Sequence, residues 1–185
     1  GGHDLPVVNP ATEQVVSRLR EADAAEVDAA VRAAREAFDR GPWPRLTLDD
    51  RKDVLYRIRD VLRAHTDELA YLECVNTGLP MLRIRDLKGF LTYVTREPKG
   101  VGALIAPWNA PLALASMRVA TCIAFGNTCV LKPSEYTPVS MLRMVELFHE
   151  AGLPPGVVNL VNGRGGVTGV ALVSNPGIDM VGFTG

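Results

Sequence analysis

From residue 100 onward, strand-like apolar runs alternate strictly with helix-like segments. The strand-like runs are GVGALIAP (100–107), NTCVLKP (127–133), GVVNLVNG (156–163) and DMVGFTG (179–185). The segments between them are NAPLALASMRVATCIAFG (109–126), TPVSMLRMVELFHEAG (137–152) and GGVTGVALVSN (165–175). Strict alternation of this kind predicts a parallel α/β sheet flanked by helices. In the second helix, the sequence predicts Thr137 as the N-cap and Pro138 at the first helical position.

The charge distribution separates the two halves of the chain. Residues 100–185 carry only four basic and four acidic side chains, whereas the whole chain has 20 and 21. A charge-poor half is expected where parallel strands are buried on both faces. The first half therefore corresponds to solvated helices packed around that sheet.

Three helices are predicted in the first half. The first starts with Asp23 and Glu26 in capping-box spacing and ends before Gly41-Pro42. The second begins near Thr47 and the third at Thr66. The stretch FLTYVT (90–95) is rich in β-branched and aromatic residues, which favours a strand or an extended arm.

Composition excludes several classes of function. The net charge of −1 does not favour binding to nucleic acid. No apolar run reaches the roughly 18 residues that a membrane span needs, and the N-terminal residues lack the features of a secretion signal. The three cysteines form no CxxC pair and have no ligand spacing with histidines, so we expect no metal site. Their odd, scattered arrangement favours a reducing, cytoplasmic location.

Ligands of parallel α/β sheets bind at the carboxyl ends of the strands. The four predicted strands end in the turns APWNAP, KPSEYTP, NGRGGVTG and GFTG. Each turn carries polar or glycine residues beside the start of a helix, except that the chain stops at GFTG. Four such turns at one edge predict a nucleotide site.

The individual turns leave alternatives open. Gly163, Gly165 and Gly169 have the spacing GxGxxxG, which suits either a close approach to a phosphate or simple turn formation. No acidic residue lies about 20 positions further on, and Asp179 is the nearest. Lys132 and Glu135 suit hydrogen bonding to ribose hydroxyls, or a surface ion pair at a helix start. Asn109 suits an oxyanion donor, a helix cap, or both.

Taken together, PWNAP, LKPSEYTP, EAGLPPGVVNLVNG and GFTG resemble the NAD(P)-dependent aldehyde dehydrogenase family. NPATEQVV and DAAEVDAAVRAAREAF resemble its N-terminal region, so the resemblance covers nearly the whole chain. NTGLPM and LTYVTREPKGVGALIAPWNAP are most similar to members that act on hydroxymuconic-type semialdehydes. The resemblance implies a Rossmann-like fold that corresponds to the N-terminal half of such an enzyme.

The resemblance also implies roles for individual residues. Asn109 would be the catalytic oxyanion-hole amide. The cofactor-binding residues would be Ile105, Ala106, Pro107, Trp108, Lys132, Ser134, Glu135, Gly165, Gly169, Phe183, Thr184 and Gly185. Among them, Lys132 and Glu135 would hold the adenosine ribose, and Glu135 would repel a 2′-phosphate. NAD is therefore expected as the cofactor in preference to NADP.

The family oxidises an aldehyde to an acid through a thiohemiacetal on a cysteine, with hydride transfer to NAD and a glutamate base. Family members carry that cysteine and glutamate beyond the GFTG turn, so we expect this chain to be a truncated, cofactor-binding part that is inactive alone. The alternative is an inactive nucleotide-binding or protein-association fragment. The expected partners are a small aldehyde or semialdehyde and, in the full-length parent, further copies of the chain.

The resemblance divides the chain into three parts. Residues 1–87 would be the helical part of the cofactor domain, 88–98 a remnant of the oligomerisation arm, and 99–185 the NAD-binding core. The family has a few dozen more residues between NTGLPM and FLTYVT, so a segment around 81–90 is expected to be missing.

Overall fold

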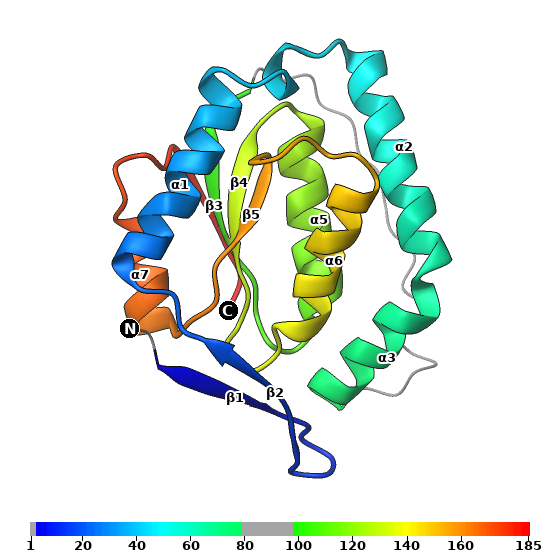
Figure 1. The fold of residues 1–185 in the computed structure, drawn as a ribbon, viewed down its shortest axis with the longest axis vertical. Helices are drawn as coiled ribbons and strands as arrows, with labels where there is room; N and C mark the ends of the chain where they lie inside the picture. Colours follow the sequence, from blue (N-terminus) through cyan, green and yellow to red (C-terminus); the bar gives the residue numbers. More distant parts are fainter. Residues whose placement is uncertain (1–2, 79–97) are drawn as a thin grey trace.

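The computed structural model describes residues 3–78 and 98–185, and its centre is a four-stranded parallel sheet (Figure 1). The strands are β3 (Val101–Ile105), β4 (Thr128–Lys132), β5 (Val158–Leu160) and β6 (Met180–Phe183). They lie in the order β5-β4-β3-β6. All four predicted strands are thus confirmed, as is their parallel arrangement. The strand predicted at 90–95 lies outside the described residues.

Helices cover both faces of this sheet. On one face lie α2 (Leu48–Ala64), α5 (Pro111–Ala124) and α6 (Val139–Glu150), and on the other lie α1 (Ala24–Asp39) and α7 (Val170–Val173). Strand side chains alternate between the two faces. Leu104 and Leu131 therefore pack with the first group of helices, whereas Ala103 and Val130 pack with α1 and α7.

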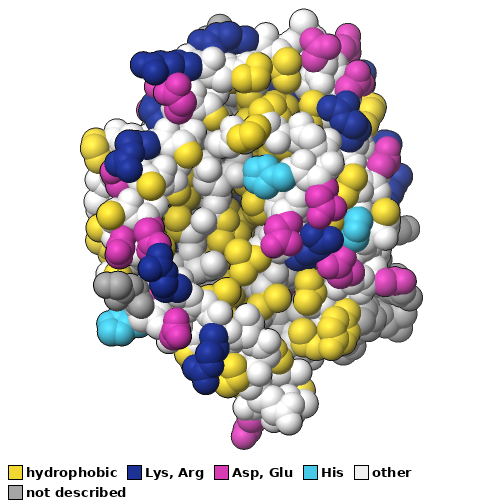
Figure 2. All heavy atoms as spheres, in the orientation of Figure 1, with side chains coloured by type: hydrophobic (Ala, Val, Ile, Leu, Met, Phe, Trp, Pro, Cys, Tyr) yellow, Lys and Arg dark blue, Asp and Glu magenta, His cyan; other side chains and the backbone are white. Residues whose placement is uncertain are grey.

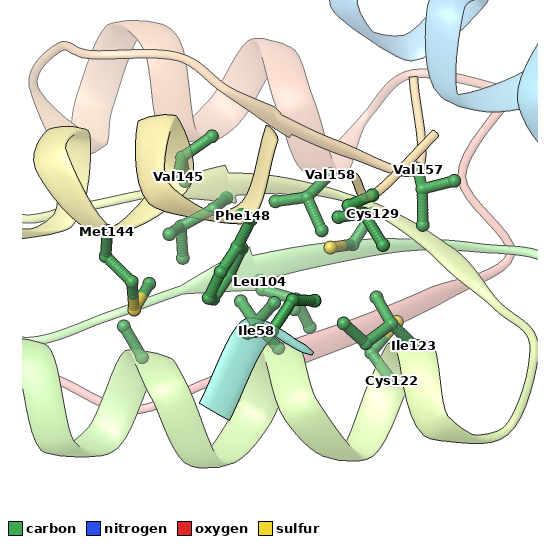
Figure 3. Packing of buried hydrophobic residues seen from close by; sticks show 14 of the residues in the cluster. Ile58, Leu104, Cys122, Ile123, Cys129, Met144, Val145, Phe148, Val157 and Val158 are labelled. Atoms are coloured by element: carbon green, nitrogen blue, oxygen red, sulfur yellow. The ribbon is translucent and has the colours of Figure 1, made fainter. Parts of the chain in front are cut away.

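The larger of the two apolar cores fills the space between the sheet and the first group of helices (Figure 3). Phe148 of α6, Ile58 of α2 and Leu104 of β3 meet in its middle. Cys122 and Cys129 are buried in the same core, and the three cysteines of the chain are free thiols. Cys122 and Cys129 therefore behave as small apolar side chains.

The predicted helix starts are confirmed in the first half. Asp23 and Glu26 form a complete capping box at the start of α1, and the Thr47 side chain accepts a hydrogen bond from the Asp50 main chain at the start of α2. The third helix, α3, spans Thr66–Thr77 as predicted and ends at Gly78, whose φ of 75° is left-handed.

Two helix predictions in the second half are wrong in detail. The helix α6 begins at Val139, so Pro138 rather than Thr137 is the cap residue, and no side chain caps it. The helix predicted over 165–175 is a π-helical turn at Gly165–Gly169 followed by the short α7. A run with three glycines in five residues carries little intrinsic helix stability, which explains the irregular first turn.

An antiparallel hairpin at the N-terminus was not predicted. Its strands are β1 (Asp4–Val8) and β2 (Val15–Arg20), with an irregularity in register between Val7 and Val8. In Figure 1 the hairpin lies at the bottom, the end of the molecule towards which the parallel strands run. A short 3₁₀ turn, Trp43–Arg45, joins α1 to α2.

The surface follows the charge distribution of the sequence. Figure 2 shows charged side chains mainly around the periphery of one face and hydrophobic or uncharged atoms along its middle. Within the described ranges, no helix has the length and apolar character needed to cross a bilayer.

Candidate functional site at the carboxyl edge of the sheet

The sheet places the predicted turns along one edge. Ile105 lies between Lys132 of β4 and Phe183 of β6 in the strand register, so the last residues of three strands are side by side. Leu160 of β5 pairs with Leu131, one residue before Lys132. The turns that contain Asn109, Lys132, Gly165 and Thr184 therefore follow neighbouring strands at the same edge.

Lys132 is the most deeply buried charged residue of this edge, with 2% of its surface exposed. Its ammonium donates to the main-chain oxygen of Pro133 at 2.7 Å and lies 3.9 Å from a carboxylate oxygen of Glu135. Burial lowers the pKa of Lys132, and the carboxylates of Glu135 and Glu21 offset part of this shift. A buried lysine with a single ion-pair partner keeps donors available for a further acceptor.

The turn after Lys132 is compact. Ser134 is buried and its hydroxyl accepts a hydrogen bond of 3.3 Å from the main chain of Tyr136, while its carbonyl accepts one from Thr137. Glu135 is about one quarter exposed, so its carboxylate is accessible from the solvent side of the edge. The predicted pairing of Lys132 with Glu135 is therefore present, in a partly buried form.

The glycine turn Gly165–Gly169 lies directly against Lys132. A Cβ atom at Gly169 would be 3.5 Å from Lys132 Cε, so the turn backbone packs on the lysine stem. Gly165 and Gly166, in contrast, border open space, where side chains would occupy room beside the turn. Thus Gly169 serves the packing of Lys132, and Gly165 leaves the approach to the turn clear.

Asn109 and Trp108 are exposed in the turn after β3, whereas Ala106 and Pro107 are buried and Ile105 is half-buried. Asn109 does not cap α5, whose cap residue is Ala110, and the Asn109 side chain has no hydrogen bond within the described ranges. The interpretation of Asn109 as a helix cap is therefore wrong.

The first turn of α5 is instead satisfied by a residue that the sequence did not indicate. Glu73 of α3 is 3% exposed, and its carboxylate accepts a hydrogen bond of 2.9 Å from Leu112 N and another from the hydroxyl of Ser140 in α6. Burial raises the pKa of Glu73, against the effect of these two hydrogen bonds. A lone glutamate in a helix has no sequence signature that would reveal such a role.

The GFTG turn is fixed to the sheet and to α5. The main-chain N–H of Thr184 donates to Ile105 O at 3.1 Å, and Arg118 of α5 donates to Phe183 O at 3.1 Å and to the Thr184 hydroxyl. Phe183 as a whole remains 63% exposed. Arg118 is a second residue of this edge that sequence reasoning missed.

Asp179 lies at the opposite edge. It is at the amino end of β6, where its carboxylate accepts a hydrogen bond of 2.7 Å from Val101 N and pairs with Arg35 of α1. Asp179 thus holds the start of the sheet and takes no part in the candidate site.

Two surface depressions stand out in the described part of the chain, and neither is lined by Lys132, Glu135 or the glycine turn. The larger, an open groove of about 460 Å³, runs beside β6 and α5 and is lined by apolar residues that include Met117, Phe125 and Val181. The smaller depression lies at the C-terminal end of α1, near Gly156. The candidate site is therefore defined by its turns and coincides with neither depression.

The sequence of the chain matches that of known proteins along its full length. The model of the aldehyde dehydrogenase family matches residues 1–87 and 81–185. Aldehyde dehydrogenase 1 of Tanacetum cinerariifolium is 40% identical over 211 aligned positions, which cover 100% of this chain and 42% of that protein. The mitochondrial aldehyde dehydrogenase family 2 member B4 of Arabidopsis thaliana is 37% identical over 211 positions, which cover 100% of this chain and 39% of that protein. Because the chain has 185 residues, these relatives carry positions that it lacks.

Solved structures agree with the fold. The NAD⁺ complex of an aldehyde dehydrogenase from Bacillus cereus superposes with a TM-score of 0.89 at 38% identity, covering 99% of this chain and 43% of that one. Aldehyde dehydrogenase C of Pseudomonas syringae, in complex with NAD⁺ and octanal, gives 0.90 at 40% identity, covering 98% and 42%. The chain spans about 42% of the length of such proteins. With a family model that matches both halves of its sequence, this chain belongs to the aldehyde dehydrogenase family.

Proposed function

We propose that this chain provides the NAD-binding part of an NAD-dependent aldehyde dehydrogenase that oxidises a small aldehyde or semialdehyde to a carboxylic acid. The observation that carries the proposal is the buried Lys132 beside Glu135, packed under a glycine turn at the carboxyl edge of a parallel sheet. Similarity to proteins solved with NAD⁺ supports the same cofactor.

The residues of the edge fit a dinucleotide. Gly165 and Gly166 border open space that a side chain would fill, so a ligand can approach the turn backbone closely. Lys132 can donate to a ribose hydroxyl while the carboxylate of Glu135 accepts from one. In this proposal, Ser134 shapes the turn that presents Glu135, and Ile105 to Trp108 line the cofactor beside Phe183, Thr184 and Gly185.

The cofactor supplies the chemistry of the reaction by accepting a hydride from the substrate. The residues of this chain bind the cofactor and orient it and the substrate. Asn109, exposed after β3, would donate its amide to the oxygen of the substrate where negative charge develops. Since Asn109 is exposed and its side chain has no hydrogen bond within the described ranges, its orientation would be set when substrate and cofactor bind.

These 185 residues are proposed to bind the cofactor rather than to complete the reaction. Cys122 and Cys129 are buried in the apolar core, and Cys74 lies on α3, outside the four turns. None of the three cysteines is therefore placed as the thiolate nucleophile that the family requires. We also propose that the chain divides into residues 1–87, 88–98 and 99–185, with the roles expected from the sequence. The full-length parent is proposed to be a cytoplasmic homo-oligomer.

Glu135 would also determine the choice of cofactor. A carboxylate that accepts a ribose hydrogen bond repels a phosphate placed on the same ribose, so NAD is favoured over NADP. Lys132, which is buried and already paired with Glu135, does not remove that repulsion.

Titration of the purified chain with NADH and with NADPH, followed by nucleotide fluorescence, tests the proposal. We expect saturable NADH binding and weaker NADPH binding. Glu135→Ala should weaken NADH binding by about tenfold, which corresponds to the loss of one hydrogen bond to a charged group. The same variant should reduce the difference between the affinities for NADH and NADPH. Glu146→Ala, which removes an exposed carboxylate of α6, is the matched control. Absence of any saturable NADH signal from the folded chain would refute autonomous cofactor binding.

The alternative, an association fragment, has one supporting observation. Met117, Val181 and Phe183 are exposed apolar side chains on and beside β6, which is an edge strand of the described sheet. Light scattering over a concentration series distinguishes the two functions, because an association fragment would form oligomers without binding NADH.

A further inference from the structure

An ion pair between Glu21 and Arg164 links the N-terminal segment to the glycine turn. The carboxylate of Glu21 accepts three hydrogen bonds from Arg164: from its main-chain N at 2.9 Å, from Nε at 2.9 Å and from Nη2 at 2.8 Å. Glu21 is 3% exposed, whereas the side chain of Arg164 is about half exposed. A buried carboxylate that is fully engaged in this way can fix the position of the backbone that binds it.

The next residues add two further links to the same turn. The main chain of Ala22 donates to Asn162 O at 2.7 Å, and the hydroxyl of Thr168 donates to Ala22 O at 2.9 Å. Residues 21 and 22 therefore hold the start of the turn, through Asn162 and Arg164, and its end, through Thr168. The π-helical turn between these points has three glycines and little intrinsic stability of its own.

The position of this turn matters to the proposed site because Gly169 packs on the stem of Lys132. We infer that Glu21 and Arg164 are positioning residues, which hold the Gly165–Gly169 turn against Lys132 in the geometry that receives the adenosine end of NAD. This inference rests on the proposed function. Neither residue is expected to touch the reacting atoms.

The hydrogen bonds predict an order among variants. Glu21→Ala removes all three hydrogen bonds to Arg164. Arg164→Ala removes only the two from the guanidinium, because the main-chain N–H of residue 164 can still donate to Glu21. The ionised state of Glu21 supports this arrangement, since the hydrogen bonds from Arg164 lower the pKa of Glu21 to about 2.

NADH titration and hydrogen exchange on the unliganded chain test the inference together. We expect NADH binding to weaken by about tenfold in Glu21→Ala and about threefold in Arg164→Ala. The amides of Gly165–Gly169 should exchange faster in the same order, with those of β4 unchanged. Glu36→Ala, which removes an exposed carboxylate of α1, should alter neither readout.

A merely structural role is distinguished by Ile58→Val, which removes a methyl group from the core far from the turn. This variant should lower the melting temperature without changing NADH affinity or exchange in the turn. Unaltered turn exchange and NADH affinity in Glu21→Ala, or equal weakening of NADH binding in Ile58→Val, would overturn the inference. If Glu21→Ala does not fold, the half-exposed Arg164→Ala decides by the same two readouts. If the wild-type chain does not bind NADH, the proposed function fails for this chain, and the exchange of the turn still decides whether the pair positions it.

Discussion

Glu73 provides the sharpest stability prediction, because it is a buried acid that joins three helices. Its carboxylate accepts hydrogen bonds from Leu112 N at the start of α5 and from the hydroxyl of Ser140 in α6. Glu73→Ala leaves the buried hydroxyl of Ser140 and the partly buried N–H of Leu112 without this acceptor. An unpaired buried donor costs about 1–3 kcal/mol, so we expect the free energy of unfolding to fall by about 2–4 kcal/mol.

Glu73→Gln should behave differently. The amide oxygen can still accept from Leu112 N, and the amide nitrogen can donate to Ser140 Oγ. The substitution also removes a charge whose burial is costly, as the raised pKa of Glu73 shows. At neutral pH we therefore expect the free energy of unfolding of Glu73→Gln to be within about 1 kcal/mol of the wild-type value or higher than it.

The pH dependence follows from the direction of the pKa shift. Because the pKa of Glu73 is raised above its ordinary value of 4.5, the folded state binds a proton more readily than the unfolded state does. The contribution of Glu73 to stability is then largest below pH 4.5 and is lost as the pH rises through the raised pKa. Glu73→Gln lacks this loss, so its stability relative to the wild type should increase with pH.

Urea denaturation at about pH 5 and about pH 8, followed by circular dichroism, measures these differences. Glu68→Gln is a suitable control, because Glu68 is an exposed carboxylate of the same helix that pairs with Arg143 of α6. It should change stability by less than about 1 kcal/mol. If Glu73→Gln were as destabilising as Glu73→Ala at both pH values, the assignment of Glu73 as a buried acceptor of two hydrogen bonds would be wrong.

The remaining predictions concern acid stability and two glycines. The pKa of Glu21 is lowered from 4.5 to about 2, so its contribution to stability is present above pH 4.5 and is lost as the pH falls towards 2. In Glu21→Gln the free energy of unfolding should therefore depend less on pH between about 4.5 and 2 than in the wild type. An equal pH dependence in the two proteins would contradict the lowered pKa. Gly152 and Gly156 both have left-handed φ values, of 86° and 81°. A Cβ atom at Gly156 would lie 2.8 Å from Ala33 O of α1. A Cβ atom at Gly152 would lie no closer than 3.9 Å to its nearest neighbour, the side chain of Arg57. Urea denaturation should thus show a loss of about 1 kcal/mol for Gly152→Ala, from backbone strain alone, and a clearly larger loss for Gly156→Ala; equal losses would mean that the contact with α1 relaxes freely.

Much of the fold was predictable because local signals and the global arrangement agree. The strand runs from residue 100 are almost free of charge, and their burial on two faces demands that composition. The capping box at Asp23 and the cap at Thr47 act within one turn of the chain, so their signatures are local as well. The hairpin β1–β2 was missed because its strands are largely exposed and lack a clear alternation of apolar and polar residues.

The candidate site was predictable in its strand-end turns but not in what holds them. Lys132 and Glu135 follow the same strand, so their proximity was visible in the sequence. Glu21 and Arg164 are separated by 143 positions, and Arg118 and Thr184 by 66. Such pairings depend on how the elements pack, and a single sequence contains no pattern from which that packing can be read.

The buried charges provide an argument for the site that does not depend on family resemblance. Four charged side chains are classed as buried within the described ranges: Glu21, Arg51, Glu73 and Lys132. Arg51 donates to main-chain oxygens of Trp43, Leu46 and Ala124. It therefore provides a donor to the connection between α1 and α2 and to the C-terminal end of α5. The other three lie at the carboxyl edge, where they contact the glycine turn, the start of α5 and the turn after β4.

Buried charge is costly unless it is paired, and a core of this size could be built without it. Glu21 accepts three hydrogen bonds from Arg164, and Glu73 accepts one from the main chain of Leu112 and one from the hydroxyl of Ser140. Lys132 differs, because its ammonium has one main-chain acceptor and a carboxylate at 3.9 Å, beside a turn whose glycines border open space. The ammonium of Lys132 therefore has donors left for a further acceptor, and the buried Thr137 Oγ1 and Asn162 Oδ1 of the neighbouring turns have no hydrogen-bond partner within the described ranges. Incompletely satisfied polar groups that gather at one edge are expected where a ligand binds rather than where the fold alone is stabilised.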